Sequence, residues 1–220
     1  AVVALAGDRV VSTDILAGTG VHAPYLSHDR CQHWEPLTAP VETDYLESGS
    51  PDVEEEAVVD IWARDGKMAC GGWDGIWMEE EGEWKRAVLM GGDFIRGMAF
   101  SWPDTQKIPV MYVGTYTGGV VYSSDGGRNW EAKNWGLQEE NIQDIMVDAQ
   151  DSSRIYALDN HRLYRSEDGG ISWTGPIFEE SLSFLAADPL IGGEVWVQRE
   201  DILQHSLDGG KTWEPVEGVG

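Results

Sequence analysis

Two aspartates, Asp60 and Asp144, occupy equivalent positions near the start of two apolar segments, 58–63 and 142–147. A pair of carboxyl groups flanking a glycosidic bond can act as general acid and base in its hydrolysis. Arg96 falls nearby when the apolar segments are aligned, and its positive charge can neutralise such carboxylates. Because the sequence holds 39 acidic residues, coincidences of this kind are expected, and solvated surface charge is the simpler interpretation of this candidate site.

Four potential metal ligands lie close together in the sequence: His22, His28, Cys31 and His33. Imidazole and thiolate groups bind zinc and other soft cations. The spacing matches no standard structural zinc site, and three of the four residues share one predicted turn, where alternating side chains point apart. We therefore interpret them as exposed turn residues and expect neither a metal site nor a cofactor.

A motif of serine, aspartate, glycine and tryptophan recurs along the sequence with the spacing S-x-D-x-G-x-x-W. Three full copies span residues 123–130, 166–173 and 206–213, so that the aspartates are 43 and 40 residues apart. A fourth copy at 27–34 has cysteine in place of the glycine, and segment 75–84 keeps only part of a fifth. The motif residues are Ser27, Asp29, Trp34, Ser123, Asp125, Gly127, Trp130, Ser166, Asp168, Gly170, Trp173, Ser206, Asp208, Gly210 and Trp213.

The types of residue in this motif suit a self-contained hairpin turn. Glycine tolerates the positive φ angles of a tight turn, and the serine and aspartate side chains can bond the exposed N–H groups of the turn. The tryptophan ring can pack under the hairpin. The carboxylate of one turn falls short of the six to eight oxygen ligands that calcium prefers. We therefore predict a structural role for the motif.

Each repeat contains short apolar segments rich in β-branched and aromatic residues, separated by Gly and Asp turns. Such segments predict strands, and no segment has a sustained helical period. Four strands per repeat of about 40–50 residues are typical of a β-propeller blade. We predict an all-β fold with one domain, residues 1–220, built as a β-propeller of five four-stranded blades. The expected blades are 1–40, 57–90, 94–136, 141–178 and 181–220, the last packing against the first.

The motif resembles the Asp-box, or BNR repeat, of the WD40/YVTN/BNR-like propellers. This repeat is found in sialidases, sortilin-type sorting receptors, xyloglucan-degrading glycosidases and photosystem-assembly propellers. The resemblance implies a propeller with Asp-box hairpin turns, but no single activity, because the same repeat serves unrelated functions. The Arg-Ile-Pro signature of sialidases does not occur in this sequence, which disfavours sialidase activity.

The charge of the protein excludes several classes of partner. The formal net charge is -24, from 39 acidic and 15 basic residues, so binding to nucleic acid is excluded and an anionic membrane surface is disfavoured. No apolar run approaches the roughly 20 residues of a spanning helix. A folded, acidic, lysine-poor sequence resembles proteins of salt-accumulating halophiles, and we expect such an origin. With two cysteines, Cys31 and Cys70, and no signal peptide in this sequence, we expect free thiols and a cytoplasmic location.

An acidic insertion, residues 38–56, is the most individual feature of the sequence. It contains Tyr45 and Leu46, and the repeat that follows it, whose motif is eroded, contains Trp73 and Trp77. Long loops on rigid scaffolds often carry recognition, and tryptophan and tyrosine are favoured at interfaces. We expect a protein-binding face here; the alternative is a variable, solvated loop beside a decayed repeat.

The specific motifs are structural, and no complete catalytic constellation can be read from the sequence. We therefore predict a non-catalytic scaffold that binds a protein partner, such as an assembly or accessory subunit. The alternative is a glycan-binding or glycoside-hydrolase-like propeller that acts at the channel mouth around Asp60, Arg96 and Asp144.

Overall fold

The computed structural model of the 220-residue protein describes residues 2–7, 15–19, 25–27, 32–36, 59–64, 67–72, 75–80, 83–89, 93–101, 109–178, 181–188 and 191–216. These residues form strands and turns, and no α-helix occurs among them, which confirms the all-β prediction. Within the same residues there is accordingly no helix long and apolar enough to cross a membrane.

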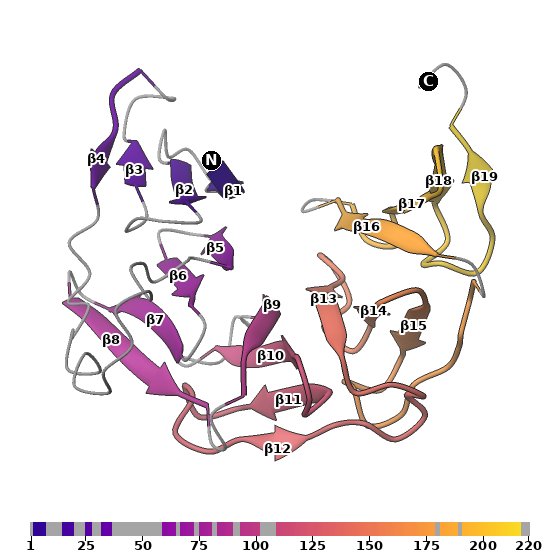
Figure 1. The fold of residues 1–220 in the computed structure, drawn as a ribbon, viewed down its shortest axis with the longest axis horizontal. Helices are drawn as coiled ribbons and strands as arrows, with labels where there is room; N and C mark the ends of the chain where they lie inside the picture. Colours follow the sequence, from indigo (N-terminus) through magenta and orange to yellow (C-terminus); the bar gives the residue numbers. More distant parts are fainter. Residues whose placement is uncertain are drawn as a thin grey trace, which may run out of the picture. The chain divides into compact units, whose positions relative to one another are not determined.

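The protein divides into two compact units, and the first of them, Ala1–Ile95, contains two antiparallel sheets of four strands. In both sheets the strands lie in sequence order (Figure 1). The strands of the first sheet are β1 Val2–Gly7, β2 Ile15–Thr19, β3 Tyr25–Ser27 and β4 Glu35–Pro36. Those of the second sheet are β5 Asp60–Arg64, β6 Lys67–Gly71, β7 Gly75–Glu80 and β8 Glu83–Val88.

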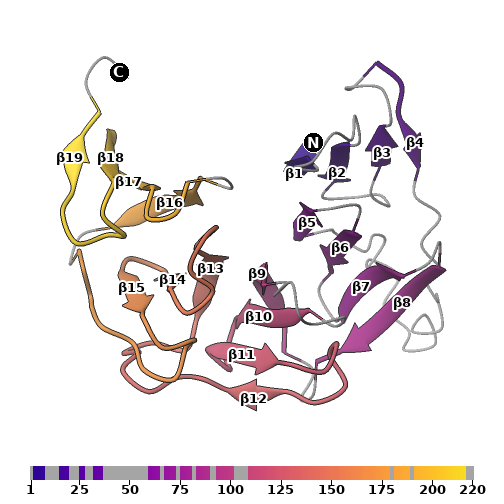
Figure 2. The ribbon, with the colours of Figure 1, turned by 180° about the vertical axis from the view of Figure 1, so that it is seen from behind.

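The second unit, Arg96–Gly220, contains three more antiparallel sheets (Figure 2). The first is formed by β9 Ile95–Ser101, which begins at the boundary, with β10 Val110–Thr115, β11 Val120–Ser123 and β12 Glu131–Ala132. The next is formed by β13 Ile142–Val147, β14 Ile155–Asp159 and β15 Leu163–Ser166. The last is formed by β16 Leu182–Ala187, β17 Val195–Arg199, β18 Ile202–Ser206 and β19 Glu214–Pro215. The single domain and the closed five-bladed ring stay predictions.

Among the first strands of the five sheets, β5 and β13 match the apolar segments predicted at 58–63 and 142–147 within two residues. Three of these strands, β1, β13 and β16, have a register shift at the same place, near their beginning. Asp144 and Phe184 directly follow this shift on β13 and β16. A β-bulge redirects the side chain next to it, so these two positions are equivalent by geometry as well as by sequence.

The prediction of four strands in every blade is wrong for the sheet of β13, β14 and β15, which has three. An isolated bridge between Arg165 and Thr174 stands where the fourth strand was expected. In the last sheet the amide of Val216, three residues after Trp213, donates to the carbonyl of Leu203, whereas here the equivalent bond comes from Ile177, four residues after Trp173. One extra residue thus separates the bridge from the next bond to β15, which Ile177 donates to Leu163, and this residue interrupts the ladder.

Apolar side chains fill the space between neighbouring sheets of the second unit. One core cluster joins β9–β12 to β13–β15, and another joins β13–β15 to β16–β19. Because both of its faces are covered, every residue of β14 is buried. Two glycines let the backbones approach: a Cβ on Gly97 would lie 2.9 Å from Cα of Asp144, and one on Gly114 would lie 2.6 Å from a methyl group of Ile142.

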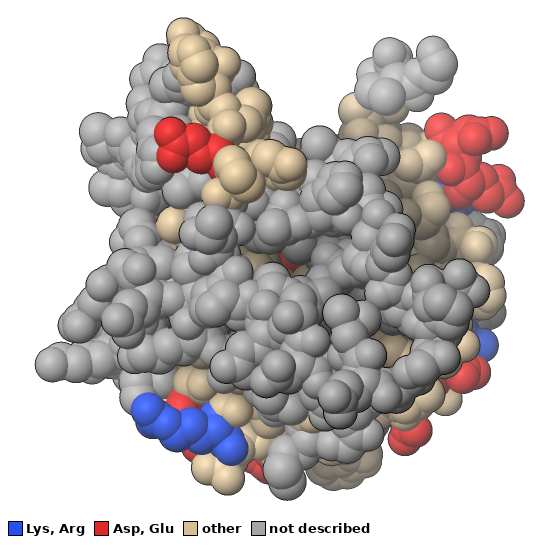
Figure 3. Space-filling view, turned by 60° about the vertical axis from the view of Figure 1, so that its left-hand side comes forward, with Lys and Arg blue, Asp and Glu red and all other residues tan. Residues whose placement is uncertain are grey.

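The acidic residues of the described part of the protein lie mainly at its surface. On the face in Figure 3 the described aspartates and glutamates form separate red groups, with few basic residues beside them. Asp148 and Asp159 are the buried acidic residues in the described part, with exposed fractions of 5% and 1%. Asp148 contacts Arg154 at 3.2 Å and accepts the amide of Gly193 from the next sheet at 2.6 Å, so its charge joins two sheets.

Candidate functional site

The serines of the three full Asp-boxes are buried and hold their turns from inside. Ser166 is 1% exposed, and its hydroxyl accepts the amide of Gly170 at 2.8 Å and donates to Asp168 at 2.8 Å. The boxes of β11 and β18 repeat both bonds, at 2.9 Å each in the first and at 2.8 and 2.9 Å in the second. The serine therefore bonds two residues of one turn at once.

The aspartates of these boxes bind the residue before the tryptophan, a contact that the sequence reasoning missed. Asp168 accepts the amide of Ser172 at 2.9 Å and its hydroxyl at 2.5 Å. Asn129 and Thr212 supply equivalent donors in the other two boxes. The signal was available, because the position before each of these tryptophans holds a polar residue.

The hydrogen bonds to these carboxylates lower their pKa values. Bonds from the side chain and amide of Asn129, with weaker ones from Ser123 and Arg128, lower the pKa of Asp125 to about 2. The pKa values of Asp168 and Asp208 are lowered in the same way, by bonds from Ser172 and from Thr212. A donated hydrogen bond favours the charged form of a carboxyl group. These carboxylates are thus held ionised as acceptors for the turn.

The glycines and tryptophans of the boxes complete a structural unit. The second glycine of each full box has a positive φ angle, and a Cβ on it would lie 3.7 Å from the Trp173 ring in the second copy and 3.3 Å from the Trp213 ring in the third. The indole N–H of Trp173 donates to the carbonyl of Lys133 at 2.7 Å, and that of Trp213 to Gly210 at 3.2 Å. These contacts join each turn to itself or to neighbouring backbone, as a structural role of the boxes requires.

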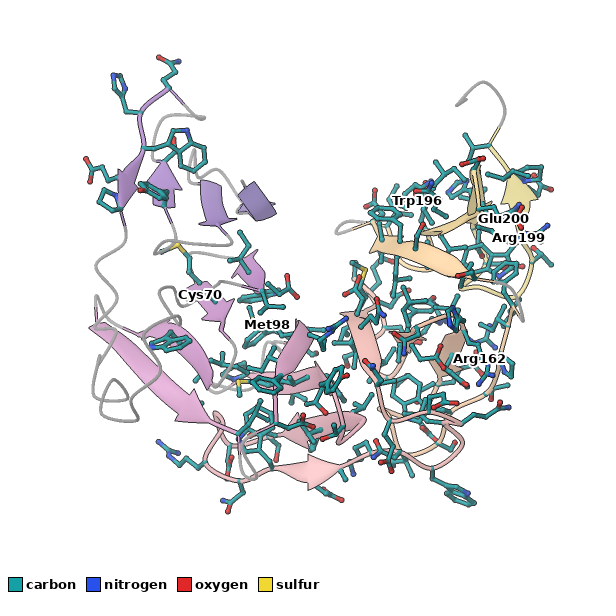
Figure 4. All side chains as sticks on the ribbon, in the orientation of Figure 1. Cys70, Met98, Arg162, Trp196, Arg199 and Glu200 are labelled. Atoms are coloured by element: carbon teal, nitrogen blue, oxygen red, sulfur yellow. The ribbon has the colours of Figure 1, made fainter. Side chains whose placement is uncertain are left out.

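The earliest Asp-box is described only in part. Ser27 is buried, and Trp34 is 36% exposed. Asp29, His22, His28 and Cys31 lie outside the described residues, and His33 is exposed. Across the residues that the structure describes, no group of three or more histidines, cysteines, aspartates and glutamates could hold a metal ion. Cys70 is buried on β6 (Figure 4).

The three candidates for the channel mouth fall into different units. Asp60 lies in the first unit, and Arg96 and Asp144 lie in the second. Each aspartate is half-buried, and one oxygen of each accepts the amide of the next residue, Ile61 or Ile145, at 2.8 Å. Neither unit by itself therefore assembles the predicted acid and base pair.

Arg96 and Asp144 lie on neighbouring strands of the second unit. A Cβ on Gly97, the residue after Arg96, would lie 3.2 Å from a carboxylate oxygen of Asp144, which places that carboxylate over the β9 backbone. The guanidinium carbon of Arg96 lies 5.8 Å from the ring centroid of Tyr116. β9 and β10 are antiparallel neighbours. The start of β9 therefore lies beside the end of β10 and the turn that leads to β11.

One candidate for partner binding is corrected by the structure. Trp77 was predicted as a surface contact, but it is 6% exposed on β7, where residues 75–78 are all buried. Tyr45, Leu46, Trp73 and the insertion 38–56 lie outside the described residues. The eroded repeat also differs from an Asp-box turn: Glu80 pairs with Glu83, so that β7 and β8 form a long hairpin.

The sequence reasoning missed two exposed aromatic residues of the second unit, Tyr116 and Phe184, which are 48% and 46% exposed. Tyr116 lies in the turn after β10, and Phe184 takes on β16 the position that Asp144 takes on β13. We call the set Arg96, Tyr116, Gln143, Asp144 and Phe184 the inner-strand edge. Phe184 carried a usable signal, because an aromatic residue stands at a position that is aspartate or glycine in the three repeats before it.

Polar contacts extend the inner-strand edge along the neighbouring turns. The amide group of Gln143 donates to Asn160 in the turn between β14 and β15, and His161 in the same turn contacts Ser181 at 3.1 Å. The guanidinium of Arg162 donates to Gln138 at 3.1 Å. These contacts hold the turns that flank the start of β13.

A separate cluster lies on the last sheet. Val195 and Val197 of β17 pack toward β13–β15, so Trp196 lies on the opposite face of the strand (Figure 4). Its ring stacks on His205 with centroids 4.7 Å apart, and His205 contacts Glu194 at 3.1 Å. These cross-strand pairs are typical sheet-stabilising contacts.

Comparison with known proteins agrees with this geometry. The family model of the BNR/Asp-box repeat matches residues 204–215, which include the box between β18 and β19. The structure resembles YCF48 bound to a D1 peptide, with a TM-score of 0.64 and 15% identity over 99% of this protein and 67% of that one. YCF48 and the GH74 enzymes that the structure also resembles are β-propeller proteins. The fold is a β-propeller.

The structure of this protein is as similar to the structures of two GH74 enzymes as it is to that of YCF48. An ancestral GH74 enzyme has a TM-score of 0.67 and 15% identity, over 99% of this protein and 31% of that enzyme. The GH74 xyloglucanase from Xanthomonas campestris has a TM-score of 0.62 and 17% identity, over 99% of this protein and 45% of that enzyme. The β-propeller thus spans less than half the length of these enzymes. No curated protein matches the sequence.

Proposed function

We propose that this β-propeller is a non-catalytic scaffold that binds a protein partner at the inner-strand edge. The observation that carries the proposal is two exposed aromatic residues: Tyr116, whose ring lies under the half-buried Arg96, and Phe184, which takes on β16 the position of Asp144 on β13. Aromatic residues and arginine are enriched where proteins bind each other. The similarity to YCF48 in complex with a D1 peptide supports peptide binding by a propeller with this repeat.

The rival proposal is a glycan-binding or glycoside-hydrolase-like propeller, which the likeness to GH74 enzymes favours. Glycoside hydrolysis by the usual mechanisms needs two carboxyl groups on either side of the bond. The oxygen of Asp144 that bonds the amide of Ile145 is already engaged. Its predicted partner Asp60 belongs to the other unit, so the acid and base pair gains no support from the described geometry.

A comparison of variants tests the proposal. Tagged wild-type protein and the double variant Tyr116→Ala/Phe184→Ala are used to capture partners at high salt, and the retained proteins are identified by mass spectrometry. Trp135→Ala is the matched control, because Trp135 is 78% exposed in the connection between β12 and β13 and is not part of the inner-strand edge. We expect a partner that is retained by wild type and control but lost with the double variant.

A thermal-shift screen against oligosaccharides tests the rival, because a ligand that binds the folded state raises the melting temperature. The screen includes xyloglucan fragments, and the same mixtures are analysed for hydrolysis products. We expect no shift and no hydrolysis. A sugar-specific shift that disappears in the Tyr116→Ala/Phe184→Ala variant would replace the scaffold proposal by the rival.

A further inference from the structure

Arg96 differs from Arg154, Arg162 and Arg165 of the second unit in its surroundings. Its guanidinium lies over the Tyr116 ring, and none of the described residues places a carboxylate within ion-pair distance of it. Three arginines of the same unit do have such partners: Arg154 with Asp148 at 3.2 Å, Arg162 with Glu139 at 3.9 Å and Arg165 with Glu167 at 3.3 Å.

A half-buried arginine that has no carboxylate partner among the described residues is unexpected in this protein, where 39 acidic residues face 15 basic ones. Arg96 is half-buried, so part of its hydration is already lost, and a cation–π contact alone leaves its N–H donors unused. The planar guanidinium matches a carboxylate with two parallel hydrogen bonds. Charge complementarity at this position therefore favours an anionic group.

The neighbouring Asp144 restricts the kind of anion. Its carboxylate lies over Gly97, the residue after Arg96. A second charge close to this carboxylate is repelled, and the repulsion grows with the charge of the ligand. A singly charged carboxylate is therefore favoured over a phosphate group. The exposed ring of Tyr116 offers an apolar surface to the carbon atoms that carry the carboxylate.

We infer that Arg96 and Tyr116 bind one carboxylate of the protein partner, which belongs either to an Asp or Glu side chain or to the partner's C-terminus. The inference rests on the proposed function and names the chemistry that the inner-strand edge recognises. The guanidinium donates two N–H groups to the carboxylate, and the tyrosine ring packs against the adjoining carbon atoms.

Three peptides test the inference and separate the two sources of a carboxylate. They are Ac-Ala-Leu-Ala-Leu with a free C-terminus, amidated Ac-Leu-Glu-Leu-Ala, and its neutral counterpart amidated Ac-Leu-Gln-Leu-Ala. Binding is followed by the NMR signal of the Arg96 side-chain Nε–H group, which is assigned from its absence in Arg96→Lys. The titrations use about 1 M KCl, where charges interact over only about 3 Å, so that the net charge of the protein does not mask the contact.

We expect a saturable shift with at least one carboxylate peptide, with an affinity about five- to tenfold above that of the neutral peptide. Arg96→Gln should remove this difference, and Arg96→Lys should restore part of it. Arg128→Gln is the matched control for charge, because Arg128 is exposed in the Asp-box turn at the opposite end of β11 from Tyr116. This variant should bind the carboxylate and neutral peptides with the same difference in affinity as wild type.

Three results would overturn the inference. The Glu and Gln peptides could bind equally, or neither carboxylate peptide could give a saturable shift. Arg96→Gln could also keep the preference for a carboxylate peptide over the neutral one. The same Arg96→Gln protein, once its melting temperature matches wild type, is used in the capture experiment. Loss of the captured partner supports the inference. If Arg96→Gln retains a partner that Tyr116→Ala/Phe184→Ala loses, the carboxylate inference fails while the proposed scaffold function stands.

Discussion

At the scale of single residues, the serine and the aspartate of an Asp-box contribute unequally to stability. Ser166 is buried and Asp168 is exposed, although both bond the same turn. Removal of the buried hydroxyl leaves the amide of Gly170 without a partner, at a cost of about 1–3 kcal/mol. Water can replace most of the bonds that an exposed carboxylate makes, so its loss should cost about 1 kcal/mol or less.

We therefore predict that Ser166→Ala destabilises the protein more than Asp168→Ala. Denaturant unfolding at high salt measures both free energies of unfolding. Neither variant should weaken partner binding by the protein that remains folded, because the boxes lie at the ends of the sheets opposite to the inner-strand edge. A larger loss of stability for Asp168→Ala would contradict this ranking.

The titration of Asp125 is a second property of single residues. Its pKa is lowered to about 2 in the folded protein, mainly by Asn129. A carboxyl group with a lowered folded pKa stabilises the fold above its unfolded pKa of about 3.9, and this contribution disappears as the pH falls through the folded value. We predict that the stability advantage of wild type over Asp125→Asn is constant above about pH 5 and declines between about pH 4 and pH 2.

Thermal unfolding of both proteins across this range measures the effect, and the NMR signal of the Asp125 carboxyl carbon reports the pKa directly. If this signal titrates with the ordinary pKa of aspartate, the bonds from Asn129 do not form in solution.

At the scale of strands and sheets, the approach of β9 to β13 depends on a residue without a side chain. A Cβ on Gly97 would lie 2.9 Å from Cα of Asp144, a distance at which the backbone must move. Overpacking between well-packed elements typically costs about 1–3 kcal/mol. We predict a loss of this size for Gly97→Ala, measured by denaturant unfolding, together with a displaced Arg96 Nε–H signal. An unchanged free energy of unfolding would show that the two strands are farther apart.

The middle strands of the second unit show how position among the sheets governs burial. Every residue of β14 is buried, whereas β17 alternates between buried and half-buried residues.

Tyr112 on β10 donates to the carbonyl of Gly169 in the next Asp-box at 3.2 Å, and Tyr156 lies equivalently against Gly210. Burial raises the pKa of both tyrosines, so they stay neutral. Neighbouring sheets thus support each other's turns.

At the scale of the whole molecule, the net charge of -24 governs the response to salt. Like charges on a folded surface repel each other, and this repulsion weakens as the screening length falls from about 8 Å at 0.15 M salt to about 3 Å at 1 M. We predict that the melting temperature rises with KCl into the molar range. A melting temperature that does not change between dilute buffer and molar salt would contradict both this prediction and the expected halophilic origin.

The repeats, the strands and the Asp-box turns could be predicted from the sequence because each depends on residues that are close together in it. The hydrogen bonds of the serine and aspartate side chains of a box join positions at most four residues apart, such as Ser166 and Gly170, so their geometry follows from the local backbone conformation. The first strand of each repeat was predictable for the same reason, because its apolar pattern is continuous. The three-stranded sheet was missed because the extra residue after Trp173 matters only for a ladder formed with a different segment, around Leu163.

Only the tertiary structure decided which side chains meet across the sheets. Nothing near Trp77 in the sequence indicates that it is buried, since burial depends on what covers both faces of β7. The contacts of Arg96 with Tyr116, and of Asp144 with Gly97, join segments about 20 and 47 residues apart. The sequence determined the repeat and the acidity of this propeller through local pattern and composition. The inner-strand edge exists only because antiparallel pairing and packing between sheets bring distant residues together.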